Sequence, residues 1–556
     1  MIHATVARRG LLALALVALA GFGLLHAADK DESKDKYASD SSKTAKSALQ
    51  PSLTGKLDTR ALARYIDQAI DLRLDAEKVK PSPPADDAEF LRRVYVDLVG
   101  HIPSADQAAA FLDSKDPDKR AKLIDSLLAS DDYGKHMADV WMNLLVKRDS
   151  DNRFVKFEPL TEWLAKNFNE NTPWNTMARD LLTAEGDQDA NPAVTFFLAN
   201  NTVDKMTDVT TKDFLAVQLQ CAQCHNHPFS DWKQTEYWGM ADFFEKVQLT
   251  GPKNPNKQDG VPGIEESAGK AGRKPKLPDS AKTVPAKLLG GPEVKLGARE
   301  KARPILAKWM TAPENPYFAK AMVNRAWFQL FGRGVVNPVD DIAGVSPPSH
   351  PQLFVDLADQ FASNGFDLKQ LYRAICNTQA YQRTSKPTAD NAEADGGLYA
   401  HMTVQVMTPE EQFDSIFQVL APNQDPREMA LPRGPQAGAK GAKRQGLTAR
   451  SAFTAFFEDE DATDPTEFQQ GIPQALRLMN GPGLNNAAIL NPLVKTGKTP
   501  EQIIERLYLI TLSRRPTAEE QERLVAYVGQ HKSEAHNGYE DVLWALMNSS
   551  EFVMNH

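Results

Sequence analysis

Apolar residues recur at intervals of three and four positions along most of this 556-residue chain. The recurrence is clearest over residues 60–66, 90–99, 105–112, 122–128, 318–331 and 353–361. This spacing places apolar side chains on one face of an α-helix, whereas a strand would alternate apolar and polar positions. Such alternation is almost absent from the sequence. The pattern therefore predicts a mainly α-helical fold.

A long polar stretch divides the helical pattern into two parts. Residues 251–303 are rich in Pro, Gly and Lys and poor in aromatic residues, which is typical of a linker or a large surface insertion. Four apolar residues within it favour a small β-hairpin: Val284, Leu288, Val294 and Leu296. We therefore predict two helical domains, at 57–250 and 304–556. A second polar loop interrupts the later domain at 433–446.

A weak repeat relates the two ends of the chain. The segments Arg93-Val94-Tyr95 and Pro103-Ser104-Ala105 recur, at one constant offset, as Arg506-Leu507-Tyr508 and Pro516-Thr517-Ala518. Each copy predicts a helix, a tight turn at Pro, and a Ser or Thr cap that opens the next helix. We interpret the copies as a shared helix-turn-helix packing unit rather than as a duplicated binding site.

The N-terminus carries a pattern typical of an export signal. Arg8 and Arg9 precede an apolar run from Gly10 to Leu25, and Ala27 and Ala28 supply a small-residue exit. We predict a signal peptide over residues 1–28, or an N-terminal membrane anchor if this segment is not cleaved. A disordered tether at 29–56 follows, because its Lys, Asp and Ser residues lack apolar periodicity.

The composition, with 42% hydrophobic and 25% charged residues, is that of a soluble globular protein. The formal net charge is -9, and loss of Arg8 and Arg9 with the signal would make it about -11. Because phosphate binding needs clustered positive charge, nucleic acid is not an expected partner.

Two of the three cysteines form a motif with definite chemistry. Cys376 lies alone in an apolar helical pattern and is expected to be a buried small hydrophobe. The others lie in Cys221-Ala222-Gln223-Cys224-His225, the signature for covalent attachment of a c-type haem. Phe214 and Val217 precede them at helical spacing, so we predict that one helical stripe carries both thiols.

Haem attachment explains each residue of this motif. Thioether bonds to two vinyl groups on one porphyrin edge need two sulfurs about one turn apart, and the adjacent imidazole then reaches the iron. We predict an exported haem-binding protein in which Cys221 and Cys224 are the anchors and His225 is the proximal ligand. It would serve electron transfer or redox chemistry, with a redox or cell-envelope protein as partner and membrane contact only through an uncleaved N-terminus. Several residues are candidates for the sixth ligand: Met206, Met240, His101, His136 and His350.

Two other interpretations of the motif remain open. His225 and His227 lie close to both cysteines and could bind zinc or iron, together with carboxylates such as Asp231 or Asp341, in a metal-dependent enzyme. Alternatively, Cys221 and Cys224 form a disulfide in a cell-surface binding or scaffold protein. If haem is bound, His227 is better placed as a group that supports His225 than as a ligand on the opposite face.

Asp340 and Asp341 precede His350 by a few residues in the later domain. Paired carboxylates with a nearby histidine can perform acid–base or metal chemistry. Such residues more often cap helices and form buried ion pairs, and we favour that structural interpretation.

Two long motif sets in the chain resemble a pair of bacterial domains. The first set is Phe90-Leu91-Arg92-Arg93-Val94-Tyr95-Val96-Asp97-Leu98-Val99-Gly100 with Pro103, then Leu219 to Phe229 with Trp232 and Tyr237. It resembles domain of unknown function 1549. The second set is Asn324-Arg325 through His350-Pro351, then Gln379-Ala380-Tyr381-Gln382 and Gln474 to Asn480. It is similar to the usual partner of that domain, domain of unknown function 1553.

The resemblance implies a secreted protein of the type abundant in planctomycetes, without an established activity. Longer members carry a cytochrome c-like domain toward the N-terminus. This chain has only the tether at that place, so the prediction of haem depends on Cys221, Cys224 and His225 alone.

Overall fold

The computed structural model of the chain describes residues 53, 55–146, 155–251, 261–267, 284–297, 299–422, 424–429, 448–455, 490–495, 497–531 and 535–556. The predicted signal segment, most of the predicted tether and the polar loop at 433–446 lie outside these residues. Among the residues described, no helix combines the length and the apolar character needed to cross a membrane.

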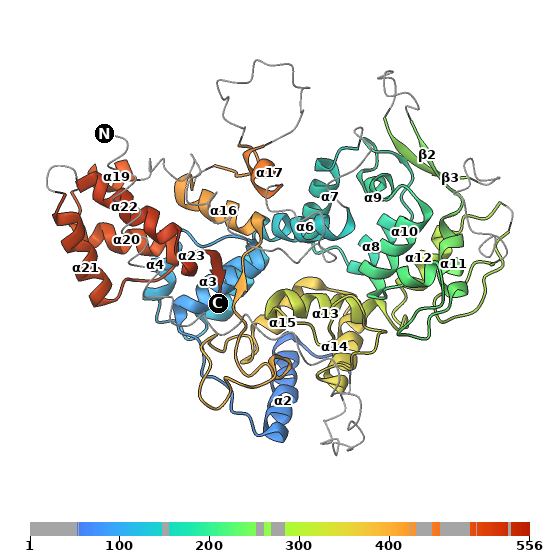
Figure 1. The fold of residues 1–556 in the computed structure, drawn as a ribbon, viewed down its shortest axis with the longest axis horizontal. Coiled ribbons are helices and arrows are strands. Elements are labelled where there is room, and N and C mark those ends of the chain that lie inside the picture. The colour runs from blue at the N-terminus through green and yellow to red at the C-terminus, as the bar shows by residue number, and fades with distance from the viewer. Residues whose placement is uncertain are drawn as a thin grey trace.

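The chain is mainly helical, as predicted (Figure 1). The first half contains α2 (Thr59–Glu77), α3 (Asp87–Val99), α4 (Ala105–Asp113), α5 (Lys119–Leu128), α6 (Asp131–Leu145), α7 (Glu158–Asn169), α8 (Trp174–Leu182), η1 (Pro192–Val194), α9 (Thr195–Ala199), α10 (Val203–Val209), η2 (Thr210–Phe214), η3 (Gln220–Gln223), α11 (Gln234–Ala241) and η4 (Asp242–Phe244). The second half contains α12 (Arg303–Met310), α13 (Phe318–Phe331), α14 (Pro351–Ser363), α15 (Leu368–Cys376), η6 (Gly396–Leu398), α16 (Pro409–Leu420), α17 (Ala449–Thr454), α19 (Leu490–Lys495), α20 (Pro500–Leu512), α21 (Ala518–Gly529), α22 (Ala535–Met547) and α23 (Ser550–Val553).

Two small antiparallel sheets accompany the helices. One has the strand order β1 (Gly186–Asp187), β3 (Gly263–Glu266), β2 (Val247–Thr250), and the other pairs β4 (Gln405–Val406) with β5 (Met554–Asn555). The hairpin predicted near Val284 to Leu296 is reduced to a tight turn, in which Lys287 and Glu293 form a single antiparallel bridge. The predicted linker therefore contributes a strand and a turn to the folded protein.

The two halves share one connected apolar core, which runs from α2 through the central helices to α23. The helices α19 to α22 lie at one end of the molecule, α13 to α15 near its centre, and α8 to α12 toward the other end (Figure 1).

The repeat is a packing unit. Each copy is a helix, a turn and a second helix that begins with a capping box, formed by Ser104 in α4 and by Thr517 in α21. Helix α20 packs on α4, Arg506 pairs with Asp106, and Arg515 Nη2 lies 3.0 Å from Asp113 Oδ1. The two copies thus stabilise each other, in agreement with the structural interpretation of the repeat.

Candidate functional site

The cysteine motif lies on the short 3₁₀ turn η3, which is separate from the helix before it. Helix α10 continues into the π-helix η2, and Ala216, with a φ of 50°, then ends the helical path. The N–H groups of Ala216 and Val217 donate back to the carbonyls of Lys212 and Thr211 and close that end. The predicted single stripe is therefore wrong, because a wide π turn and a left-handed residue break it.

Both cysteines nevertheless belong to one short turn. Cys221 lies within η3 and Cys224 is its C-cap residue, and both are exposed, with free thiols. Ala222 between them is fully buried and packs into the core. Cys376 is buried, as predicted.

Helix α11 holds this turn in place. Gln234 Nε2 donates to the carbonyl oxygens of Gln223 and Cys224, each at 3.1 Å, and Trp238 Nε1 donates to Gln223 O at 3.2 Å. These bonds satisfy carbonyls that the end of a short helix leaves without partners. The thiols therefore project from a fixed backbone.

The two histidines beside the cysteines adopt different proton arrangements. His225 Nδ1 lies 2.7 Å from the carbonyl oxygen of Asn226, so Nδ1 is the donor and the exposed ring keeps a lone pair on Nε2. His227 Nδ1 accepts from the N–H of Phe229 at 3.2 Å, which places the proton of a neutral ring on Nε2. We assign these tautomers from their partners. Only His225 is ready to coordinate through Nε2.

The later domain reaches this turn through Asp340 and Asp341. Asp340 accepts from Gln218 Nε2 at 2.6 Å and pairs with Lys212 Nζ at 3.0 Å, so it forms the predicted kind of buried ion pair. Asp341 lies within electrostatic reach of His227: burial and Asp340 raise its pKa, and His227 opposes that rise. The two carboxylates thus interact with residues on either side of the cysteine turn.

The other candidate ligands of the predicted metal or haem iron lie elsewhere. His350 packs against the ring of Tyr399 and does not join Asp341. Met206 and Met240 are buried in the core, and His101 pairs with Asp132 at 3.6 Å. In the part of the chain that the structure describes, no three His, Cys, Asp or Glu side chains gather as a set that could hold a metal ion.

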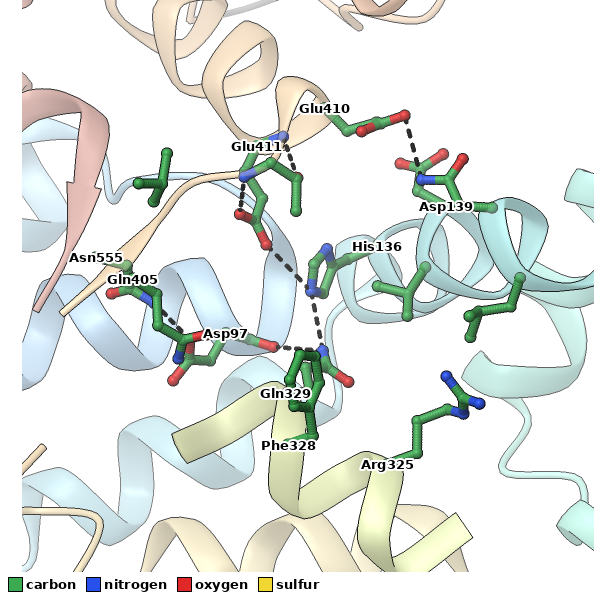
Figure 2. Close-up of a pocket in the computed structure, with 15 residues that line it drawn as sticks. Asp97, His136, Asp139, Arg325, Phe328, Gln329, Gln405, Glu410, Glu411 and Asn555 are labelled. Atoms are coloured by element: carbon green, nitrogen blue, oxygen red, sulfur yellow. Dashed lines mark hydrogen bonds and ion pairs between the residues drawn. The ribbon is translucent and has the colours of Figure 1, made fainter. Parts of the chain in front are cut away.

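The structure also contains a polar cavity that sequence analysis did not find (Figure 2). This interdomain cavity, of about 150 Å³, lies where α3 and α6 of the first domain meet α13, β4, α16 and β5. Its ionisable lining residues come from four of these elements: Asp97, His136, Asp139, Arg325, Glu410 and Glu411.

Burial changes the protonation of three groups in the cavity. It raises the pKa of Asp97 to about 7 and that of Glu411 to about 8, and it lowers the pKa of His136 to about 4. Such shifts concentrate at functional sites. One signal in the sequence was available, namely Asp97 as a carboxylate inside the apolar run Val94 to Val99.

Comparison with protein families agrees with the motifs and their order. Residues 65–249 match the protein family of unknown function DUF1549, and residues 302–528 match the protein family of unknown function DUF1553. The chain is a DUF1549–DUF1553 protein. No curated protein and no solved structure matched it. Within this DUF1549–DUF1553 protein the cysteine turn lies in the first matched segment, and the interdomain cavity takes residues from both.

Proposed function

We propose that this DUF1549–DUF1553 protein is an exported haem protein of the c type that serves electron transfer. Cys221 and Cys224 would be the thioether anchors and His225 the proximal ligand. One observation carries the proposal: two exposed free thiols lie three residues apart at a fixed turn, directly before an imidazole whose Nδ1 is anchored.

The donor atoms of this turn fit a haem. Proximal histidines donate Nδ1–H to a carbonyl or carboxylate, which orients the ring and makes Nε2 a better ligand. The bond from His225 to Asn226 O has that form. A bound haem would supply one-electron redox chemistry, with a potential set by its ligands and its exposure.

Exposed apolar side chains near the turn support a bound group or a partner there. Phe229 and Val345 are each 75% exposed, the highest values among the large apolar side chains of the described residues. Phe229 contacts the ring of His227, and Val345 follows Asp341 in the loop that reaches the turn. Exposed apolar side chains of this kind are stabilised when a porphyrin or a redox protein covers them.

Export completes the proposal. Haem of the c type is attached outside the cytoplasmic membrane, and the segment at 1–28 has the pattern of a signal. We place the protein in the periplasm or at the cell surface, with a redox or cell-envelope protein as partner.

The test is expression of the full chain in a bacterium with c-type haem maturation. We expect a haem-stained band after denaturing electrophoresis and an intact mass increased by one haem. The double variant Cys221→Ser/Cys224→Ser should lose both signals. Cys376→Ala, which removes the buried cysteine, is the matched control and should keep them.

Two results would contradict the proposal. One is the bare polypeptide mass from a competent host, and the other is haem retained by the double variant. A bare chain whose Cys221 and Cys224 are oxidised to a disulfide would instead support a scaffold protein.

A further inference from the structure

The interdomain cavity contains more hydrogen-bond acceptors than its own donors satisfy. Asn555, 6% exposed, donates Nδ2–H to Asp97 Oδ1 at 2.6 Å, but its own Oδ1 is buried without a partner. A buried polar atom without a partner destabilises the fold, so proteins rarely leave one unless a ligand or water uses it.

Glu411 provides a second underused acceptor. Its Oε2 accepts from the N–H of Thr408 at 2.7 Å and completes a capping box. Its Oε1 lies 4.0 Å from His136 Nε2, beyond hydrogen-bonding distance. Among the described residues, no lysine or arginine contacts Glu411.

His136 does not supply the missing positive charge. Its Nε2 lies 3.3 Å from Gln329 Nε2, an amide nitrogen that can only donate, so the ring nitrogen accepts and is unprotonated. Tyr372 fixes that amide by donating to Gln329 Oε1 at 2.6 Å. Glu411 Oε1 therefore faces a neutral imidazole (Figure 2).

The arginines near the cavity are engaged with other carboxylates. Asp139 pairs with Arg427 and Arg450, and Arg325 Nη2 lies 3.8 Å from Asp213 while its guanidinium lies over Trp141. When Glu411 is ionised, near and above its pKa of about 8, no lysine or arginine of the described residues therefore compensates its negative charge.

We propose that the interdomain cavity binds a small primary alkylammonium compound, with its N–H groups donating to Glu411 and Asn555. Val140, Leu144 and Phe328 line the same cavity and would contact the alkyl body. A volume of about 150 Å³ suits a molecule of a few non-hydrogen atoms. An organic cation is favoured over a metal ion, because no metal-binding set of three His, Cys, Asp or Glu side chains exists in the described part of the chain.

The test is calorimetric titration of the full-length protein at pH 8 with propylammonium chloride. We expect saturable binding, with one site per chain. Tetramethylammonium has charge but no N–H donor, and acetate is an anion. Both should bind at least about tenfold more weakly than propylammonium, because one hydrogen bond to a charged group contributes about that factor in affinity.

A matched pair of variants locates the site. Glu411→Gln keeps the capping box, since glutamine also serves at that position, but removes the charge; it should weaken propylammonium binding about tenfold or more. Glu520→Gln makes the same change in the capping box of α21, away from the cavity, and should bind as the unaltered chain does. Circular dichroism verifies that both variants are folded.

Three results would overturn the proposal: no saturable binding of propylammonium, equal binding by Glu411→Gln, or preferential binding of acetate, which would assign the cavity to an anion held by Arg325. None of these results depends on whether haem is attached at Cys221 and Cys224.

Discussion

At the scale of single residues, two carboxyl groups of the interdomain cavity keep their protons to a higher pH in the folded chain than in the unfolded chain. Glu411 has a pKa raised from 4.5 to about 8, first by burial and then by the negative charges of Asp97 and Glu410. Asp97 has a pKa of about 7, also raised by burial. A folded chain therefore holds protons at neutral pH that an unfolded chain releases.

This difference predicts how stability depends on pH. Between pH 4.5 and 8 the unfolded state releases the Glu411 proton and the folded state keeps it, so stability falls as pH rises. His136 contributes in the opposite direction, but only between its folded pKa of about 4 and its unfolded value of 6.5. Above pH 6.5 the falling contributions from Asp97 and Glu411 remain.

Glu411→Gln should remove part of this decrease in stability with rising pH. The free energy of unfolding is measured with urea at pH 6.5 and pH 8. We expect its decrease between these pH values to be smaller in the variant than in the unaltered chain, by up to roughly 1 kcal/mol per pH unit. Glu520→Gln is the control: the Glu520 pKa is lowered to about 2, mainly by its hydrogen bond to Arg514, so its contribution is constant above pH 6.5. An identical pH slope in Glu411→Gln and the unaltered chain would contradict the prediction.

The cysteine motif could be predicted from the sequence because its chemistry is local. Cys221, Cys224 and His225 are adjacent in the chain, so spacing alone brings them together. The different tautomers of His225 and His227 could not be predicted, because they depend on which backbone groups a folded loop presents.

The cavity could not be predicted because its residues are distant in the sequence. Asp97, His136, Arg325, Glu411 and Asn555 come from five elements, and only tertiary packing places them around one space. Asp97 alone showed a signal, as a carboxylate in an apolar run.

At the scale of elements, helix ends were more predictable than helix continuity. The caps at Ser104 and Thr517 follow from local hydrogen bonds and appear as predicted. The break after η2 does not follow from apolar spacing, because Phe214 and Val217 keep helical spacing across it. The contact from Ile342 N–H to Ala216 O, at 2.9 Å, shows that a distant segment takes part in this end.

The turn after α3 gives a prediction at this scale. Gly100 ends the helix with a φ of 75°, and a Cβ there would lie 2.5 Å from His136 Nδ1. Gly100→Ala therefore adds left-handed strain of about 1–2 kcal/mol and overlap with a buried ring, which costs about 1–3 kcal/mol.

Gly365→Ala is the matched control for this change. Gly365 has a φ of 78°, and no atom lies within 4 Å of the place that an alanine methyl group would take, so only the strain should apply. Urea unfolding should show Gly100→Ala destabilised by at least about 1 kcal/mol more than Gly365→Ala. Equal losses would mean that His136 moves aside without cost.

At the scale of the whole molecule, the two matched domains depend on each other. Two fully buried arginines of α3 donate to backbone carbonyls of the second half of the chain: Arg92 to Thr511, Phe552 and Met554, and Arg93 to Tyr381, Arg383 and His556. Buried guanidinium groups need such acceptors, because a charge removed from water is costly without partners. The sequence pattern of two helical domains was correct, but apolar spacing does not report which helix faces which.

Removal of the last three residues, Met554 to His556, tests this dependence. The truncation deletes β5, the partner of β4, and with it the acceptors at Met554 and His556 and the bond from Asn555 to Asp97. Each hydrogen bond lost from a buried charged group costs about 1.5–3 kcal/mol, so we expect a loss of more than about 3 kcal/mol in the free energy of unfolding. The control is His556→Ala, which keeps the backbone carbonyl that Arg93 uses and should lose little.

Because both arginines belong to the first domain, the two domains should also unfold in one transition, detected as coincident fluorescence and circular dichroism curves. A truncated chain as stable as the His556→Ala variant would show that these buried arginines find other acceptors.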